Sequence, residues 1–218
     1  EFELKTKKNT DSLLLTHVLS HTTGLPYHTY TTLVEDGTDL PSMLAELKNV
    51  NIIADPGELY SYQNVAYSII GEVIRARTGK TYQQQMKERV FTPLKMNDAS
   101  MSYDEIMRND NVAQPHLHWR KGWNTTKISD TYYNVGPAGG VNASISDMAQ
   151  WLMAMLGAKR NFVSSETLDK IFTPMVKAKT KNRYFRKWVG RSDSHYALGW
   201  RVLNFKNDTL LYHGGYVR

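Results

Sequence analysis

The fold of this chain is constrained most by two hydrophobic patterns and their order: helical spacing comes first and strand-like segments follow. Apolar residues recur at helical spacing over much of its length, most clearly in the segment 65–74. After residue 195 the strings "HYALGWRVLNF" and "TLLYHGG" are typical of strands and flank Asn207-Asp208, as in a β-hairpin. Helices followed by strands predict an α+β fold. We expect a mainly helical region at 10–175 and a sheet hairpin at 195–218.

Local signals predict where several helices begin and end. Thr81 with Gln84, and Ser144 with Asp147, have the spacing of a capping box, in which two residues bond each other's backbone amides. The first pair predicts a helix that ends before Pro93, because proline interrupts helices. The other helices are expected at 12–20, 39–48, 65–78, 145–156 and 165–172. The polar segment 97–137 is predicted to be an irregular connection that carries function or covers a site.

Length and composition limit the classes to which the chain can belong. Its 218 residues suffice for one large domain, and we expect a single domain over 1–218. A lone hairpin is marginally stable in water, so we expect a domain truncated at both ends, its sheet completed by other residues. No run is apolar and long enough to span a bilayer. The absence of cysteine excludes disulfides and thiolate nucleophiles.

The net charge of +6 is concentrated in one segment. Seven basic residues lie between 177 and 191: Lys177, Lys179, Lys181, Arg183, Arg186, Lys187 and Arg191. A nucleic-acid-binding protein would use such residues for phosphates and the interleaved aromatic residues for base stacking. No nucleic-acid-binding motif accompanies them, which favours a solvated basic loop and no nucleic-acid partner.

Several stretches resemble, in the same order, the serine β-lactamase-like and penicillin-binding family of class C β-lactamases, D-alanyl-D-alanine carboxypeptidases and related esterases. These stretches are "LLTHVLSHTTGLP", "PGELYSYQNVAYSIIGEVI", "ERVFTPLKMNDASM", "GPAGGVNASISDMAQWLMAML", "YALGWRV" and "YHGGYVR". Each motif alone is weak, whereas their order and spacing cover nearly the whole chain. The resemblance implies an antiparallel sheet flanked by helices, with a mostly helical region beside it.

The resemblance also implies acyl transfer by a serine nucleophile, with a tyrosine that carries the proton to the leaving group. Tyr62 matches that tyrosine, and Asn64 matches the asparagine of the Tyr-x-Asn motif. The catalytic His213, with Gly214 and Gly215, matches the opposite strand of the site. The Tyr62 phenol should therefore face this strand.

Two further substrate-binding residues follow from the same resemblance. The backbone N–H of Tyr216 corresponds to the strand donor of an oxyanion hole. Tyr133, in the long polar connection, is expected to line the pocket. The expected partner is a small-molecule or peptide substrate, and the chemistry needs no metal and no organic cofactor.

Each candidate has a structural alternative. Tyr62 could be a core tyrosine whose hydroxyl finds a backbone partner, and Asn64 could serve only as the N-cap of its helix. His213 could face solvent on its strand. His116 and His118 have the spacing of two metal ligands on one strand face, but no third ligand accompanies them.

One departure from the family pattern is the absence of Ser-x-x-Lys from these residues. In the family the nucleophile precedes the "LLTHVLSHTTGLP" segment. We therefore expect the serine and lysine to lie upstream of Glu1, which would make the isolated chain inactive. The substrate would be an ester, a D-amino-acid peptide or a β-lactam, and the location a bacterial periplasm or extracellular space. The alternative is a non-catalytic binding homologue with the same fold.

Overall fold

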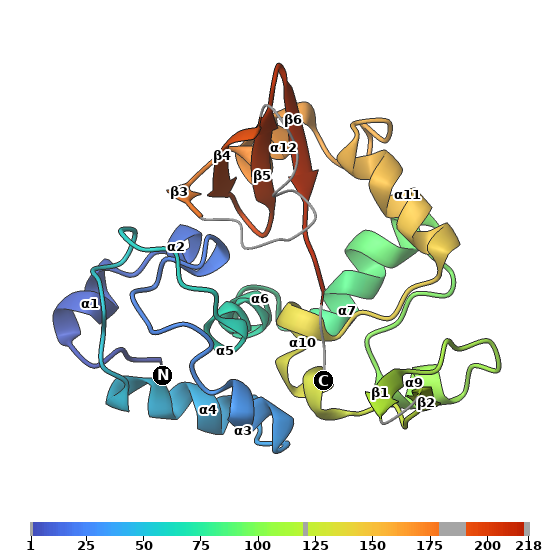
Figure 1. Cartoon of the computed structure of the whole chain (residues 1–218), viewed down its shortest axis with the longest axis horizontal. Coiled ribbons are helices and arrows are strands. Elements are labelled where there is room, and N and C mark those ends of the chain that lie inside the picture. Colours follow the sequence, from blue (N-terminus) through green and yellow to red (C-terminus); the bar gives the residue numbers. More distant parts are fainter. Residues whose placement is uncertain (1, 120–121, 179–190, 216–218) are drawn as a thin grey trace.

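The computed structural model of the chain describes residues 2–119, 122–178 and 191–215. Most of the basic segment 177–191 and the proposed donor Tyr216 lie outside these residues. Among the basic residues that are described, Lys177 forms an exposed ion pair with Asp193, with 3.1 Å between Nζ and Oδ1. The predicted α+β class is confirmed, since helices pack beside an antiparallel sheet (Figure 1).

The helices up to residue 107 are α1 (Lys7–Ser12), α2 (Leu15–Leu19), α3 (Thr31–Glu35), α4 (Leu40–Glu46), η1 (Leu47–Asn49), α5 (Asn64–Tyr67), α6 (Ile69–Thr78), α7 (Tyr82–Met86), η2 (Lys87–Phe91), α8 (Thr92–Leu94) and α9 (Tyr103–Met107). The later ones are η3 (Thr131–Val135), α10 (Gly136–Gly139), α11 (Ile145–Met155) and α12 (Ser165–Phe172). The strands are β1 (His116–Trp119), β2 (Gly122–Thr125), β3 (Val176–Lys177), β4 (Arg191–Tyr196), β5 (Arg201–Phe205) and β6 (Asp208–Tyr212).

Both predicted capping boxes are confirmed. The Thr81 hydroxyl accepts the N–H of Gln84, and the Gln84 side chain accepts the N–H of Thr81. Ser144 and Asp147 exchange the same pair of bonds at the start of α11. These bonds satisfy amides that the first helical turn leaves without partners, so each helix begins where the sequence predicted.

The predicted helix end before Pro93 is wrong. A π-helical turn, η2, leads directly into α8, and Pro93 lies in the first turn of α8, where a backbone N–H is not needed. Burial favours the extra turn, because Phe91 and Leu94 are both in the core. The helix ends at Lys95, which adopts a positive φ of 59°.

The chain contains more sheet than the single hairpin that we predicted. β3, β4, β5 and β6 form a four-stranded antiparallel sheet in that order. The β5–β6 turn is Lys206-Asn207 rather than Asn207-Asp208, because Phe205 pairs with Asp208 and Lys206 supplies the positive φ of 53°. The sequence of β4, "RSDSHY", is mostly polar and does not alternate between apolar and polar residues, so the sequence pattern alone did not reveal this strand.

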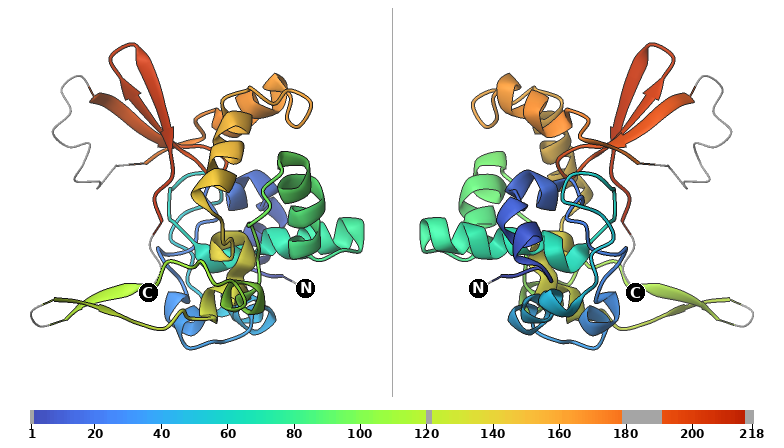
Figure 2. Two further views of the ribbon diagram at one scale, coloured as in Figure 1. Left: turned by 90° about the vertical axis from the view of Figure 1, so that its right-hand side faces the viewer. Right: turned by 90° about the vertical axis from the view of Figure 1, so that its left-hand side faces the viewer.

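The connection 97–137 is also more regular than predicted. It contains α9, η3 and an antiparallel hairpin, β1–β2, that projects from the body of the molecule (Figure 2). This hairpin lies inside the region that was predicted to be mainly helical. His116 and His118 are on β1, where all four residues are exposed to solvent.

Two apolar cores hold the elements together. One joins the first helices to α5 and η3, with Leu25, Val34, Met43, Leu47, Val65 and Val135 at its centre. The other packs α8 against α11 and α12, with Phe91, Leu94, Met101, Ala154 and Leu168. In Figure 1 the sheet lies above α5, α6 and α10, with α12 behind it and α11 beside it, and the chain leaving β6 descends towards α10. That descent brings residues 213–215 beside the helices that begin at Asn64 and Gly136.

Candidate active site

The segment 62–64 shows why a tyrosine and an asparagine two residues apart belong to one site. Gln63 has extended backbone angles, φ −141° and ψ 106°, and its side chain is fully buried. The Gln63 amide accepts the N–H of Thr29 at 3.1 Å and donates to the carbonyl of Leu25 at 3.3 Å. Alternate side chains of an extended chain point to opposite sides. Tyr62 and Asn64 are therefore directed together towards the cleft, and both line it.

Asn64 is not the N-cap of its helix. α5 begins at Asn64 itself, Gln63 occupies the N-cap position, and no side-chain bond caps the helix. The structure thus gives Asn64 a place in the lining of the cleft without the capping role that was the simpler alternative.

His21 holds the tyrosine segment from behind. Its Nδ1 accepts the backbone N–H of Gln63 at 3.1 Å, and its carbonyl accepts the N–H of Ser61 at 2.8 Å. The imidazole is buried, and its centroid lies 4.1 Å from that of Tyr62. Burial, reinforced by the charges of His213, Arg201 and His28, lowers the pKa of His21 to about 3. The ring is therefore neutral at pH 7, with its proton on Nε2.

The opposite wall of the cleft is the segment that follows β6. The ring centroids of Tyr62 and His213 are 6.1 Å apart, with 40° between the ring planes. His213 Nε2 lies 3.1 Å from the hydroxyl of Tyr196 on β4. Burial and the nearby Arg201 lower the pKa of His213, which a backbone bond at Gly214 partly opposes. The structure therefore brings Tyr62 and His213 together in one cleft.

Gly214 and Gly215 leave their side of the cleft open. Both line it, and a Cβ added to either residue would meet no atom of the described residues within 4 Å. They lie just past the end of β6 at Tyr212, so the segment that matches the family's strand continues beyond the regular sheet here. This open backbone lets an extended ligand approach closely. Tyr216, the next residue, is outside the described part of the chain.

The cleft has a volume of about 860 Å³ and is formed by α3, the start of α5, α10, β5 and the segment after β6. A smaller cavity of about 140 Å³ adjoins the same groups and is lined by His21, Tyr62, Tyr67, Tyr196 and His213, among others. Because Tyr62 and His213 line both spaces, the two cavities are parts of one site.

Burial determines the protonation state of Tyr62. Burial raises the pKa of its phenol, and the positive charge of Arg201 opposes that rise. The phenol is therefore protonated at neutral pH and can donate a proton or a hydrogen bond. Tyr60 is half-buried and bonded to Arg201, and desolvation, which outweighs the opposing charge of Arg201, raises its pKa to about 12.

Two residues that the sequence-based reasoning missed also line the cleft. Arg201 begins β5 and donates from Nη2 to the Tyr60 hydroxyl at 3.0 Å. Tyr132 lines the cleft beside Gly139, where an added Cβ would come within 2.8 Å of the tyrosine ring. A signal for Arg201 existed in the sequence, because it follows the glycine and tryptophan of the motif "YALGWRV".

The structure does not bring Tyr133 to the cleft. Its hydroxyl donates to Oδ1 of Asn142 at 2.8 Å, and its ring packs 6.1 Å from that of Tyr103. Consecutive residues in the tight η3 turn point in different directions, so the neighbouring Tyr132 lines the cleft instead.

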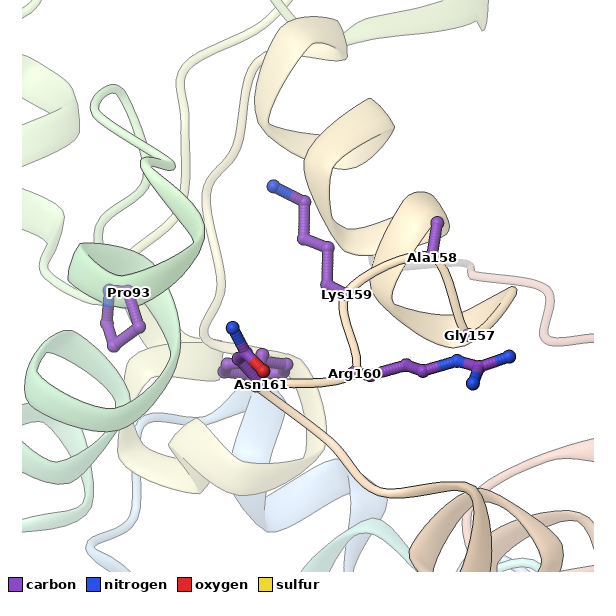
Figure 3. A pocket seen from close by; sticks show the side chains of 7 residues that line it. Pro93, Gly157, Ala158, Lys159, Arg160 and Asn161 are labelled. Atoms are coloured by element: carbon purple, nitrogen blue, oxygen red, sulfur yellow. The ribbon is translucent and has the colours of Figure 1, made fainter.

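A separate hollow of about 800 Å³ lies between Pro93 and residues 157–162 (Figure 3). Among the residues that line it, Lys159 donates from Nζ to Oε1 of Gln150 at 2.7 Å. None of the predicted site residues that the structure describes lines this hollow.

Within the described ranges, no group of three His, Asp or Glu side chains is arranged to hold a metal ion. Nor does any helix there have the length and apolar character to cross a membrane.

Comparison with known proteins agrees with this geometry. A family model described as Beta-lactamase matches residues 4–218. The unguisins hydrolase ungD' of Aspergillus campestris is 23% identical over 99% of this chain and 40% of its own length. The octameric penicillin-binding protein homologue from Pyrococcus abyssi superposes with a TM-score of 0.79 and 21% identity, over 96% of this chain and 47% of that one.

A second similar structure is the D-amino acid amidase from Ochrobactrum anthropi SV3 in complex with L-phenylalanine amide. It has a TM-score of 0.70 and 16% identity, over 94% of this chain and 57% of that one. The structural matches show a common fold, with an antiparallel sheet and flanking helices. The chain spans about half the length of these proteins.

Proposed function

Because the chain belongs to the beta-lactamase family, we propose that it forms the tyrosine side of a serine hydrolase site. In this proposal the nucleophilic serine and its lysine come from a segment that precedes residue 1 in the full-length protein. The serine attacks an ester or amide carbonyl, an acyl-enzyme forms as the leaving group departs, and water then hydrolyses the acyl-enzyme.

One observation carries the proposal, namely that Tyr62 and His213 face each other across a single cleft, with 6.1 Å between their ring centroids. Because Tyr62 and residues 213–215 line the same cleft, a substrate bound against these residues would lie beside the phenol. The phenol is protonated at neutral pH, which suits a group that delivers a proton to the leaving atom. Asn64 lies on the same side and would position the substrate by hydrogen bonds from its amide.

His213 would act as a neutral imidazole. Its lowered pKa keeps it uncharged at pH 7. With Nε2 beside the Tyr196 hydroxyl and a bond to the backbone at Gly214, the ring would be held in place as part of the wall against which the substrate lies. Gly214 and Gly215 would let the substrate backbone lie against this wall.

The names of similar proteins support an amide or peptide substrate, since they include a D-amino acid amidase and a D-aminopeptidase. A β-lactam or an ester would use the same chemistry. The relatives include proteins from Aspergillus and Dictyostelium, so family membership gives no reason to propose a bacterial envelope location.

The test is covalent labelling of the full-length protein with a fluorophosphonate probe. The wild-type protein should be labelled, and Tyr62→Phe should slow labelling by about 10²- to 10⁴-fold, the usual contribution of a positioned proton-transfer group. Tyr103→Phe is the matched control, because Tyr103 lies outside the cleft, and its labelling rate should match the wild type.

Two results would overturn the proposal. Labelling of Tyr62→Phe at the wild-type rate would remove Tyr62 from the mechanism. Complete absence of labelling and of ester turnover in the wild-type protein would instead favour a non-catalytic binding homologue of the same fold.

A further inference from the structure

The β1–β2 hairpin stands out from the body of the molecule (Figure 2). Among the described residues its two strands pair only with each other, from His116 opposite Thr125 to Trp119 opposite Gly122. All four residues of β1 are exposed. A two-stranded hairpin without a third strand or a helix against it is marginally stable in water. A surface that covered its exposed side chains would therefore stabilise it.

Three large apolar side chains of this hairpin face solvent. Leu117 is 62% exposed, Trp119 69% and Trp123 71%. Tryptophan is highly buried on average in folded proteins, and apolar side chains that gather on a surface mark a site of interaction. We call Leu117, Trp119 and Trp123 the hairpin patch.

The two tryptophans lie on opposite faces of the hairpin. Trp123 pairs with His118, the residue that precedes Trp119 in β1. Paired residues share a face and consecutive residues do not, so Trp123 points away from Trp119. Leu117 is on the face of Trp119, and on the other face the rings of His118 and Trp123 meet edge-on with 5.3 Å between centroids. A protein groove would cover one face, whereas a lipid layer surrounds an inserted hairpin on both.

The charge of this segment is complementary to an anionic surface. From residue 111 to residue 129 the sequence contains three Lys or Arg and no Asp or Glu. Of these, Lys127 belongs to the described residues and is exposed, and none of the ion pairs found among them includes it. Basic residues near a bilayer are attracted to anionic headgroups, and tryptophan is enriched at the membrane–water interface.

We propose that the hairpin patch binds the surface of an anionic lipid membrane. Leu117, Trp119 and Trp123 enter the boundary between headgroups and acyl chains, and the basic residues of the segment add electrostatic attraction. The hairpin lies in this boundary and does not span the bilayer. The binding is separate from the proposed hydrolase chemistry, because no residue of the hairpin patch lines the cleft.

The first experiment measures co-sedimentation of the full-length protein with vesicles. One set of vesicles is phosphatidylcholine, and the other is an equal mixture of phosphatidylcholine and phosphatidylglycerol. The wild type should partition into the anionic vesicles about 10-fold or more better, and added salt should reduce this preference. Replacing both tryptophans, Trp119→Ser with Trp123→Ser, should weaken partitioning into the anionic vesicles about 10- to 100-fold, because apolar area then stays in water.

A pair of leucine variants supplies the matched control. Leu117→Ser removes an apolar side chain from the hairpin patch and should weaken vesicle binding about 10-fold. Leu156→Ser removes a similarly exposed leucine, 74% exposed at the end of α11, and should leave binding unchanged. Circular dichroism verifies that each variant is folded. The proposal is wrong if the wild type does not bind anionic vesicles at low salt, or if the two leucine variants bind alike.

The second experiment identifies the surface that touches the lipid. Lipids brominated on the acyl chains should quench the tryptophan fluorescence of the bound wild type. Replacing both tryptophans by phenylalanine, Trp119→Phe with Trp123→Phe, keeps most of the apolar area, so this variant should still bind while its remaining tryptophans escape quenching. Equal quenching of the bound variant and the wild type would place another face of the protein on the membrane and overturn the proposal.

Sedimentation without lipid distinguishes a protein partner. A wild type that forms dimers and binds no vesicles, together with a monomeric double serine variant, would make the hairpin patch an interface between two copies of the protein and would overturn membrane binding. A monomeric wild type that binds anionic vesicles supports it.

Discussion

The backbone N–H of Gln63 donates to Nδ1 of the buried His21 at 3.1 Å. This bond fixes the backbone from which the neighbouring side chains of Tyr62 and Asn64 project. An imidazolium has no free lone pair at Nδ1, so protonation of His21 would break the bond. The neighbours of His21 include the cationic Arg201 and the imidazoles of His28 and His213, which all oppose a further positive charge. The site therefore depends on His21 remaining neutral.

Stability should fall on acidification because of His21. Its pKa is about 3 in the folded protein and 6.5 in the unfolded chain, so below pH 6.5 the unfolded state binds one more proton. The contribution of neutral His21 to the free energy of unfolding is fully present above pH 6.5. It is lost progressively as the pH falls towards 3, and the total loss is up to about 5 kcal/mol. Urea unfolding at several pH values measures it.

The variant for that experiment is His21→Asn, in which the amide oxygen can still accept the N–H of Gln63 but does not titrate. Between pH 6.5 and 3 its free energy of unfolding should fall less steeply than that of the wild type. The difference between the two slopes should reach about 1.4 kcal/mol per pH unit at the steepest point. The exposed His116→Asn should keep the wild-type slope. Identical slopes for wild type and His21→Asn would contradict the expectation.

Gly24→Ala should destabilise the protein by about 2 kcal/mol or more. Gly24 has a φ of +87°, and an added Cβ would lie 2.2 Å from the carbonyl oxygen of Ala54, so the backbone itself would have to move. Gly37→Ala is the control: its φ is +79°, but no atom of the residues that the structure describes lies within 4 Å of the added Cβ. Equal losses of unfolding free energy in the two variants would show that the contact with Ala54 has no cost.

Ser144→Ala should cost about 1 kcal/mol, because it removes the hydroxyl that accepts the N–H of Asp147 at the start of α11. Ser146 lies two residues later on the exposed side of the same helix. Ser146→Ala should change the unfolding free energy by less than about 0.5 kcal/mol. Thermal or chemical unfolding of the two variants distinguishes the loss of the helix cap from a general effect of replacing serine. A larger loss of unfolding free energy in Ser146→Ala than in Ser144→Ala would refute the capping role.

Gln63→Met should lower the free energy of unfolding by about 2–4 kcal/mol, more than Ser144→Ala, although it conserves side-chain volume. It would leave the N–H of Thr29 and the carbonyl of Leu25 without their partner in a buried place. The same replacement at the exposed Gln114 should be nearly neutral. Wild-type stability in Gln63→Met would mean that water or another side chain satisfies these groups at little cost.

Local motifs were the predictable part of the structure. The capping boxes at Thr81 and Ser144 specify helix starts through bonds between near neighbours, so a short stretch of sequence contains all the information. The family resemblance likewise assigned Tyr62 and Asn64 to one site. In the structure the extended backbone at Gln63 directs both side chains to the cleft.

Features set by distant contacts were not predictable from the sequence. The helix continues through Pro93 because Phe91 and Leu94 are buried against residues far along the chain. β4 is polar in sequence and becomes a strand through pairing with β3 and β5. Arg201 resembles any surface arginine until the fold places it between Tyr60 and Tyr196.

The two-residue turn at Lys206-Asn207 has a consequence for how this protein can diversify. It sets the β5–β6 register that pairs Arg201 with Tyr212. Inserting one residue into this strand pair would reverse the orientation of every following side chain relative to the opposite strand. Length variation in an outer loop would therefore alter which molecules the protein accepts, and homologues with a longer turn should differ in ligand preference even where every cleft residue is identical.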